Sequence, residues 1–359
     1  MIQYGRQSID EDDIASVVEV LRGDWLTQGP HIEKFEESVA QYVGAKYAVA
    51  YSSGTSALHG AAAAAGLGPG DVVATSPLTF MASANAARFV GAQPMLVDID
   101  KETWNIEMSA VPSNVRAVIP VHYAGLPVDL SSAQKNKQII IEDAAHALGA
   151  KTPDGMVGNC AHSDMCCFSF HPVKPITTAE GGMVTTNDPD LAERLRRFRS
   201  HEIVRLPEKG AWYYEIAELG YHYRMTDIQA ALGVTQMKKI EAFMQRRNDI
   251  ADRYRMMLAD LEIELPPRAP NGFRHGYHLF AVLVKDRRRV FDGMREAGIG
   301  VQVHYVPVHH HPVSQDIGLR PGDLPICDSV YDQILSLPIH PTLKDAEQDY
   351  VVKILTELL

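Results

Sequence analysis

The stretch SFHPVKPITTAEGG, residues 169–182, places one lysine in an unusually rigid part of the chain. Lys174 lies between Pro172 and Pro175, just after a strand expected over 165–170, where a solvated lysine would need no such rigid loop. A buried lysine has a depressed pKa and becomes a nucleophile at neutral pH. The two glycines that end the stretch permit a tight turn or a close backbone approach. Taken alone, the stretch is better explained by a surface lysine in a proline-rich turn.

A segment of small hydroxyl residues, SSGTSAL at 52–58, follows a strand expected over 47–51 and begins a helix. Free backbone N–H groups and the helix dipole at that point suit a phosphate group, and the hydroxyls of Thr55 and Ser56 add donors. The common role of such a segment is only to cap a helix. By itself it therefore does not predict a phosphate site.

A third segment, EDAAH at 142–146, directly follows a strand expected over 138–141. An aspartate at the carboxyl end of a parallel strand, such as Asp143, faces the ligand crevice of an open α/β sheet. A buried carboxylate there needs a cationic partner, and a protonated pyridine nitrogen would provide one. The plainer alternative is that Asp143 caps a helix and His146 packs against the strand.

The order of expected elements favours a mostly parallel sheet. Continuous apolar runs indicate strands covered on both faces, and helices that begin near 54 and 80 follow the first two of them. A helix over 9–21, with Asp10 or Ser8 as its cap, precedes the strands. A long charged helix over 237–261 leads to strands at 278–284 and 301–304 and helices at 289–297 and 345–358. The remaining strands of the large sheet are expected at 72–76, 94–97 and 117–121.

The net charge of −11 leaves no basic stripe for a nucleic-acid backbone. No signal peptide is visible at the start of the sequence, and no apolar run reaches membrane-spanning length. The four cysteines form no CxxC pair and no disulfide framework, and Cys166 and Cys167 are expected to be buried thiols. We therefore expect a cytoplasmic protein with no nucleic-acid and no membrane partner.

The three segments together resemble the DegT/DnrJ/EryC1/StrS sugar aminotransferases, from Tyr4 to the final helix. That family has, in order, a Gly-Thr-Ser/Ala turn, Glu-Asp-Ala-Ala-His/Gln, and Ser-Phe-x-x-x-Lys followed by Glu-Gly-Gly. The resemblance implies an α/β protein of the PLP-dependent transferase fold type I. It has a large domain with a mostly parallel sheet over 1–240 and a smaller α+β domain over 241–359. It also implies pyridoxal 5′-phosphate (PLP) as the cofactor.

The resemblance assigns cofactor contacts residue by residue. Lys174 matches the lysine that binds the cofactor covalently and moves the catalytic proton. Asp143 matches the carboxylate that keeps the pyridine nitrogen protonated, and His146 the residue beside the phenolic oxygen. Phe80 matches the aromatic residue that stacks on the ring, although without the family it would be taken for a core residue. The residues that match phosphate ligands are Ser169, Thr55 and Ser56.

The segment 219–227 departs from the family in one position. His222 stands where relatives have an asparagine that reaches the cofactor phosphate of the partner subunit, so the resemblance implies a homodimer with shared active sites. Ala179 stands where many relatives have glycine. Arg224 is a candidate for binding the carboxylate of the amino donor, with a structural salt bridge to Asp227 as the alternative.

The tail contains the run His309-His310-His311. We predict no metal there, because the three side chains diverge on an extended chain and no carboxylate or cysteine is spaced to complete a site. The resemblance instead places His304, Tyr305 and His309 near the nucleotide-sugar pocket.

Within the family, the segments at 4–7, 24–30 and 171–177 look most like the enzyme of pseudaminic acid synthesis, so Tyr4 and Thr27 are also expected to bind the sugar substrate. That enzyme transfers the amino group of glutamate to C4 of a UDP-linked 4-keto-6-deoxy-N-acetylhexosamine. The alternatives are a sister aminotransferase for the D-gluco epimer or for a GDP- or dTDP-sugar, a PLP-dependent sugar dehydratase, and a non-catalytic regulator. The presence of Lys174 argues against the sugar dehydratase and the non-catalytic regulator.

Overall fold

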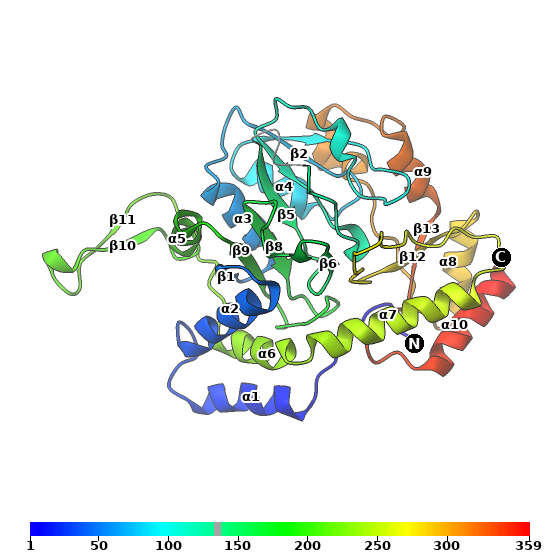
Figure 1. The fold of residues 1–359 in the computed structure, drawn as a ribbon, viewed down its shortest axis with the longest axis horizontal. Coiled ribbons are helices and arrows are strands. Elements are labelled where there is room, and N and C mark those ends of the chain that lie inside the picture. Colours follow the sequence, from blue (N-terminus) through cyan, green and yellow to red (C-terminus); the bar gives the residue numbers. More distant parts are fainter. Residues whose placement is uncertain (133–137) are drawn as a thin grey trace.

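The computed structural model describes residues 1–132 and 138–359, and a seven-stranded sheet forms its centre (Figure 1). The strand order is β1-β9-β8-β5-β4-β2-β3. Strand β9 is antiparallel to both of its neighbours, whereas every other adjacent pair is parallel. The expectation of a mostly parallel sheet is confirmed. The strands are β1 (Tyr47–Tyr51), β2 (Val72–Thr75), β3 (Gln93–Leu96), β4 (Ala117–Ile119), β5 (Ile139–Asp143), β8 (Met165–Ser169) and β9 (Gly182–Thr186).

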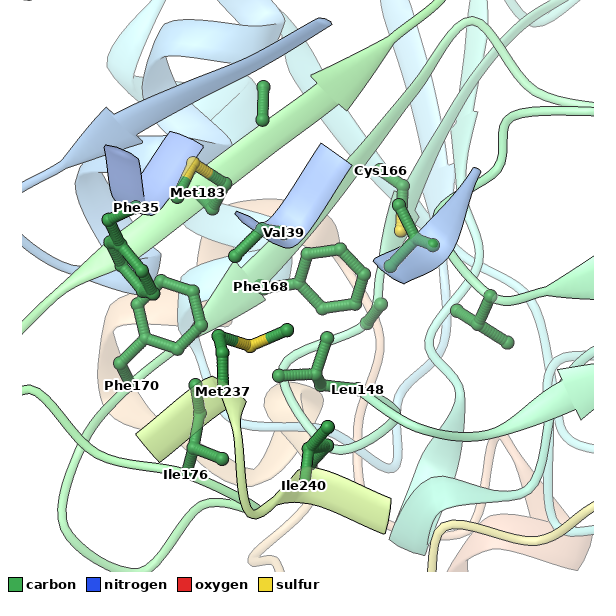
Figure 2. Packing of buried hydrophobic residues seen from close by; sticks show 14 of the residues in the cluster. Phe35, Val39, Leu148, Cys166, Phe168, Phe170, Ile176, Met183, Met237 and Ile240 are labelled. Atoms are coloured by element: carbon green, nitrogen blue, oxygen red, sulfur yellow. The ribbon is translucent and has the colours of Figure 1, made fainter. Parts of the chain in front are cut away.

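Both faces of this sheet are covered, which explains why its strands are apolar without alternation. Successive side chains of a strand point to opposite faces. Thus Cys166 and Phe168 pack on one face against α2 (Pro30–Val43), α6 (Asp227–Met237) and α7 (Ile240–Met257), as Figure 2 shows. Met165 and Cys167 pack on the other face against α3 (Gly54–Ala64), α4 (Ala82–Phe89) and α5 (Pro189–Phe198).

The N-terminal helix α1 (Glu11–Arg22) begins two residues later than expected, and Asp10 is its cap, as predicted. Asp13 closes a reciprocal capping box with Asp10 and is itself buried against α6. Its carboxylate accepts hydrogen bonds from Thr235 at 2.6 Å and Gln236 at 2.8 Å. These bonds fix α1 to α6 and give a buried charge the partners it needs.

The C-terminal third forms a second layer of sheet and helices. Strands β12 (Phe280–Leu283) and β13 (Ile334–Leu337) pair antiparallel, and α8 (Arg287–Glu296) and α10 (Asp345–Leu358) pack beside them. The expected strand at 301–304 is wrong, because only Gln302 forms a bridge there, to Ser336 of β13. The expected helix over 237–261 is also corrected: α6 ends at Met237 and α7 begins at Ile240. A domain boundary near residue 240 stays a prediction.

A hairpin of β10 (Ile203–Arg205) and β11 (Tyr214–Ile216) projects from the body beyond α5 (Figure 1). The cysteines of the chain are free and buried, as expected for Cys166 and Cys167. Among the described residues, no helix is long and apolar enough to cross a membrane. The shorter elements are β6 (Lys151–Thr152), β7 (Gly155–Met156), α9 (Pro325–Gln333) and the 3₁₀ turns η1 (Met108–Ala110), η2 (Tyr123–Gly125), η4 (Pro207–Lys209), η5 (Val308–His310) and η6 (Pro312–Ile317).

Asp227 holds the start of α2, whose cap Gly29 offers no side chain. The buried carboxylate accepts the N–H of Gly29 at 2.7 Å and that of His31 at 2.9 Å. We predict that Asp227→Ala lowers the free energy of unfolding by roughly 2–4 kcal/mol, because two buried N–H groups lose their acceptor. Urea denaturation measures this free energy. Asp227→Asn keeps one carbonyl acceptor and should lose less stability. Asp252→Ala, at an exposed position of α7, should leave the stability almost unchanged.

Candidate active site

A cavity of about 330 Å³ opens at the carboxyl edge of the large sheet. An open α/β sheet binds ligands at this edge, because the loops that follow its parallel strands meet there. Nine residues that the sequence predicts for the site line it together, from six separate parts of the chain: Tyr4, Thr55, Phe80, Asp143, His146, Ser169, Lys174, His304 and Tyr305.

Lys174 lies in the loop after β8, where its N–H donates to the carbonyl of His171 at 2.9 Å. Burial lowers the pKa of its amine to about 8, and the negative charge of Asp143 opposes that shift. Among the described residues no carboxylate forms an ion pair with the amine. A substantial fraction of Lys174 is therefore neutral and nucleophilic near neutral pH.

The loop of Lys174 is held by close backbone contacts. A Cβ on Gly182 would lie 2.2 Å from the carbonyl oxygen of Ser53, and one on Gly54 would lie 2.8 Å from the Cβ of Ser169. The close approach expected of the two terminal glycines is therefore present at Gly182. Ala179 has a φ of 65°, in the left-handed region that favours glycine.

Asp143 ends β5 and is buried at the floor of the cavity. One carboxylate oxygen accepts the hydroxyl of Ser83 at 2.6 Å, and the other accepts the N–H of Ala145 at 3.1 Å. These bonds fix the carboxylate but leave it without a basic partner within the described residues. A buried carboxylate in this position suits a cationic ring nitrogen.

The start of α3 forms the end of the cavity that suits a phosphate. Ser53 caps the helix, and Thr55 and Ser169 line the cavity. Ser56 is different: its hydroxyl is buried, donates to the carbonyl of Ser53 at 2.8 Å and accepts the N–H of Ser53 at 2.9 Å. Helix capping therefore uses the hydroxyl of Ser56, and its role as a phosphate ligand stays a prediction.

His146 is buried and lines the same cavity. Its Nδ1 accepts the N–H of Ala124 at 3.2 Å, so its Nε2–H donates to the hydroxyl of Tyr305 at 2.9 Å. Burial, helped by the charge of Lys174, holds the pKa of His146 well below its usual range. Phe80 is 61% exposed, an unusual position for a large aromatic ring, and it lines the cavity, where a flat ligand could stack on it.

Sequence reasoning missed two polar neighbours. The Nε2 of His278 lies 3.4 Å from the amine of Lys174, and Ser83 holds Asp143. His278 was expected only as the first residue of a strand, and Ser83 as part of a helix. No local motif marks either residue, because each meets its partner across a long separation in the chain.

Besides Ser56, four predicted site residues lie outside the cavity. Thr27 forms a bridge with Thr226. Arg224 lines another cavity, of about 590 Å³, and forms no salt bridge with Asp227, which is bonded to Gly29 and His31. Its role in binding the carboxylate of the amino donor stays a prediction. The other two are His222, beside His201, and His309, bonded to Asp328.

The residues of the cavity fit pyridoxal phosphate. They supply an amine for its aldehyde, a buried carboxylate without a cation for its ring nitrogen, a helix N-terminus for its phosphate and an exposed aromatic face for its ring. A surface lysine and simple helix caps, the alternative explanations of the three segments, do not account for the fact that the three segments line one cavity.

Two relatives align with nearly the whole chain. A Campylobacter jejuni protein named UDP-4-amino-4,6-dideoxy-N-acetyl-beta-L-altrosamine transaminase is 36% identical, with 97% of this chain and 95% of that protein covered. A Shewanella sediminis protein named UDP-4-amino-4-deoxy-L-arabinose–oxoglutarate aminotransferase is 33% identical, with 99% and 97% covered.

Solved structures agree with the fold over its full length. Helicobacter pylori PseC, described as an aminotransferase involved in the biosynthesis of pseudoaminic acid, matches with a TM-score of 0.93 at 29% identity, covering 99% of this chain and 98% of PseC. Streptococcus pneumoniae Spr1654 in its PMP form matches with a TM-score of 0.93 at 28% identity, covering 100% and 99%, and its PLP form matches with 0.92. The profile of one family matches residues 7–356, and the chain therefore belongs to the DegT/DnrJ/EryC1/StrS aminotransferase family.

Proposed function

We propose that this chain transfers the amino group of glutamate to C4 of a UDP-linked 4-keto-6-deoxy-N-acetylhexosamine, giving UDP-4-amino-4,6-dideoxy-N-acetyl-β-L-altrosamine. The observation that carries the proposal is the buried amine of Lys174, with its lowered pKa, facing the same cavity as the unpaired carboxylate of Asp143. Pyridoxal phosphate as the cofactor is confirmed by the aminotransferase family and by the PLP and PMP forms of Spr1654.

In this proposal Lys174 would bind the cofactor covalently, and within each half-reaction its freed amine would move a proton between the substrate carbon and a carbon of the cofactor. When bound, pyridoxal phosphate supplies an electron-withdrawing ring that stabilises the negative charge left by that proton. Asp143 keeps the ring nitrogen charged, and Ser83 keeps Asp143 oriented at 2.6 Å. His278, 3.4 Å from the amine, lies where it can hold the freed lysine near the reacting carbon.

The sugar side is proposed at Tyr4, His304 and Tyr305, which line the cavity next to His146. The rings of Tyr4 and His304 lie 5.1 Å apart, and the hydroxyl of Tyr305 is held by His146. The Campylobacter jejuni relative supports the L-altrosamine product. The Shewanella sediminis relative is named for a different amino-sugar. The alternative function is therefore that of a sister aminotransferase with another 4-keto-sugar as its substrate.

A homodimer with shared active sites is also proposed. The projecting β10–β11 hairpin exposes Trp212 (79%), Tyr214 and Ile216, and Leu219 (81%) follows it. Exposed apolar groups of this size mark interaction surfaces. His222 is exposed and lies outside the cavity of its own chain, as a residue directed at a partner's cofactor would. We also propose that the protein is located in the cytoplasm, because its cysteines are free thiols.

We predict that Lys174→Ala lowers the rate of glutamate-dependent amination by at least about 10⁴-fold, because it removes both the covalent attachment point and the proton carrier. The assay follows amino-sugar formation by mass spectrometry with purified protein, PLP and glutamate. Lys151→Ala, at an exposed lysine of β6 outside the cavity, is the matched control and should keep full activity. Undiminished amination by the Lys174 variant would sink the proposed function.

Substrate choice is tested by turnover with the two C5-epimeric UDP-keto-sugars. We expect the β-L-arabino-4-ulose to be aminated at a kcat/KM at least about 10-fold above that of the D-gluco compound, a difference of ~1.4 kcal/mol in transition-state binding. A preference for the D-gluco compound, or for a GDP- or dTDP-sugar, would contradict the proposed substrate but not the proposed aminotransferase activity.

The protonation of Lys174 gives a pH-dependent prediction. In cofactor-free protein, acetylation of Lys174 by acetic anhydride needs the neutral amine, so its rate should rise with a midpoint near the pKa of about 8. Asp143 raises that pKa, so Asp143→Asn should move the midpoint to lower pH. Mass spectrometry of the peptide gives the rate at each pH. A midpoint near 10.5, the ordinary value for lysine, would contradict the desolvated site.

A further inference from the structure

Two histidines and a carboxylate outside the cavity converge at the C-terminal tail. The sequence predicts no metal here if the histidine side chains diverge along an extended chain and no carboxylate is spaced to join them. In the structure Val308–His310 form the 3₁₀ turn η5, and Asp328 of α9 approaches it. The premise is therefore wrong for His309 and His310.

The two imidazoles point at the same atom. The Nε2 atoms of His309 and His310 lie 3.0 Å and 2.6 Å from one oxygen of Asp328, Oδ1. Their ring planes are 82° apart with centroids 4.5 Å from each other. One possible ligand atom from each residue lies within 4.8 Å of the other two. Adjacent residues on a strand could not direct two side chains at one point, whereas the 3₁₀ turn does.

Further contacts orient the carboxylate of Asp328 and the ring of His310. The second oxygen of Asp328 accepts the N–H of Gly322 at 2.7 Å, and the ring of His310 meets that of Tyr331 nearly at right angles, with centroids 5.2 Å apart. Such outer contacts orient metal ligands. The Nδ1 of His309 is buried without a partner, so when a cation replaces the hydrogen bond between Nε2 and Asp328, the ring can carry its proton on Nδ1 without breaking a bond there.

We propose that His309, His310 and Asp328 bind one divalent cation of the Zn²⁺ class. Two imidazole nitrogens and one carboxylate oxygen are a common ligand set for zinc, at distances of about 2.0–2.2 Å. The ion replaces the two hydrogen bonds to Oδ1, and the ligands need only small side-chain rotations to surround it. The side chains of Asp328 and His310 are 15% and 17% exposed, which leaves the fourth position to water.

The nearby charges favour this cation on balance. Asp328 lies in the first turn of α9, and the positive end of a helix dipole disfavours a cation there. Asp98 offsets it, because its carboxylate accepts the N–H groups of Ile326 and Cys327 at 3.0 Å each. Cys327 itself is buried, and burial raises the pKa of its thiol, so it is not assigned as a ligand.

The bound ion would connect α9 to the segment that carries two cavity residues. His304 and Tyr305 lie four to six residues before the paired histidines, and the N–H of Val308 donates to the carbonyl of Pro77 at 2.9 Å. We therefore assign the site a structural role: it fastens the wall of the cavity to the C-terminal layer, at a distance from the reacting groups.

The test uses untagged, full-length protein stripped of metal with a chelator and titrated with Zn²⁺ or Co²⁺. We expect one ion per chain by elemental analysis, a Co²⁺ visible spectrum of tetrahedral type, and a higher melting temperature with metal. His310→Gln and Asp328→Asn should each weaken binding by more than about 100-fold, above the effect of losing an outer-shell partner.

His311→Gln is the matched control, because His311 belongs to the same run but not to the converging group. It should bind the ion as the unaltered chain does. Equal loss in the His311 and His310 variants, or no binding by the unaltered chain at millimolar metal, would overturn the site. Because His310→Gln leaves the Asp328–Gly322 bond in place, it tests the ligand even if the Asp328 variant unfolds.

Discussion

The desolvation of one amine governs the arrangement of the whole cavity. A lysine at the carboxyl edge of a sheet would normally be solvated or paired, but Lys174 is neither, and its lowered pKa follows from burial. Asp143 is near enough to oppose the shift without forming an ion pair. A direct salt bridge would stabilise the ammonium form and remove the nucleophile. The separation of amine and carboxylate within one cavity is thus a requirement of the chemistry.

The reversed strand β9 makes this separation possible. Its first residue, Gly182, pairs with Tyr51 at the end of β1 and with Ser169 at the end of β8. Because β9 runs antiparallel to both, the loop that carries Lys174 leaves and returns at the same edge of the sheet. The contact of Gly182 with the backbone of Ser53 then brings the start of α3 to that loop. A parallel β9 would return the chain at the opposite edge.

Local sequence could predict the elements that depend on local patterns. The strand at 47–51 and the helix at 345–358 agree residue for residue, since continuous apolar runs and helical periodicity define them. Strand β9 was missed because its five residues begin with glycine and end with two polar threonines, so they lack the continuous apolar run of the other strands. The segment 301–304 was overpredicted, since its apolar residues serve the core without a full ladder. His278, Ser83 and Asp328 could not be found locally, because each meets its partner across a long separation.

Five of the fifteen histidines form two groups with different surroundings. His146, His278 and His304 surround the cavity, and burial together with the charge of Lys174 lowers the pKa of each, to about 3 for His304. These three rings are therefore neutral donors and acceptors beside the amine. His309 and His310 instead face a carboxylate. Imidazoles beside an amine can orient that amine, whereas imidazoles beside a carboxylate offer ligands for a cation, so the partner of each ring, more than its spacing in the sequence, determines its function.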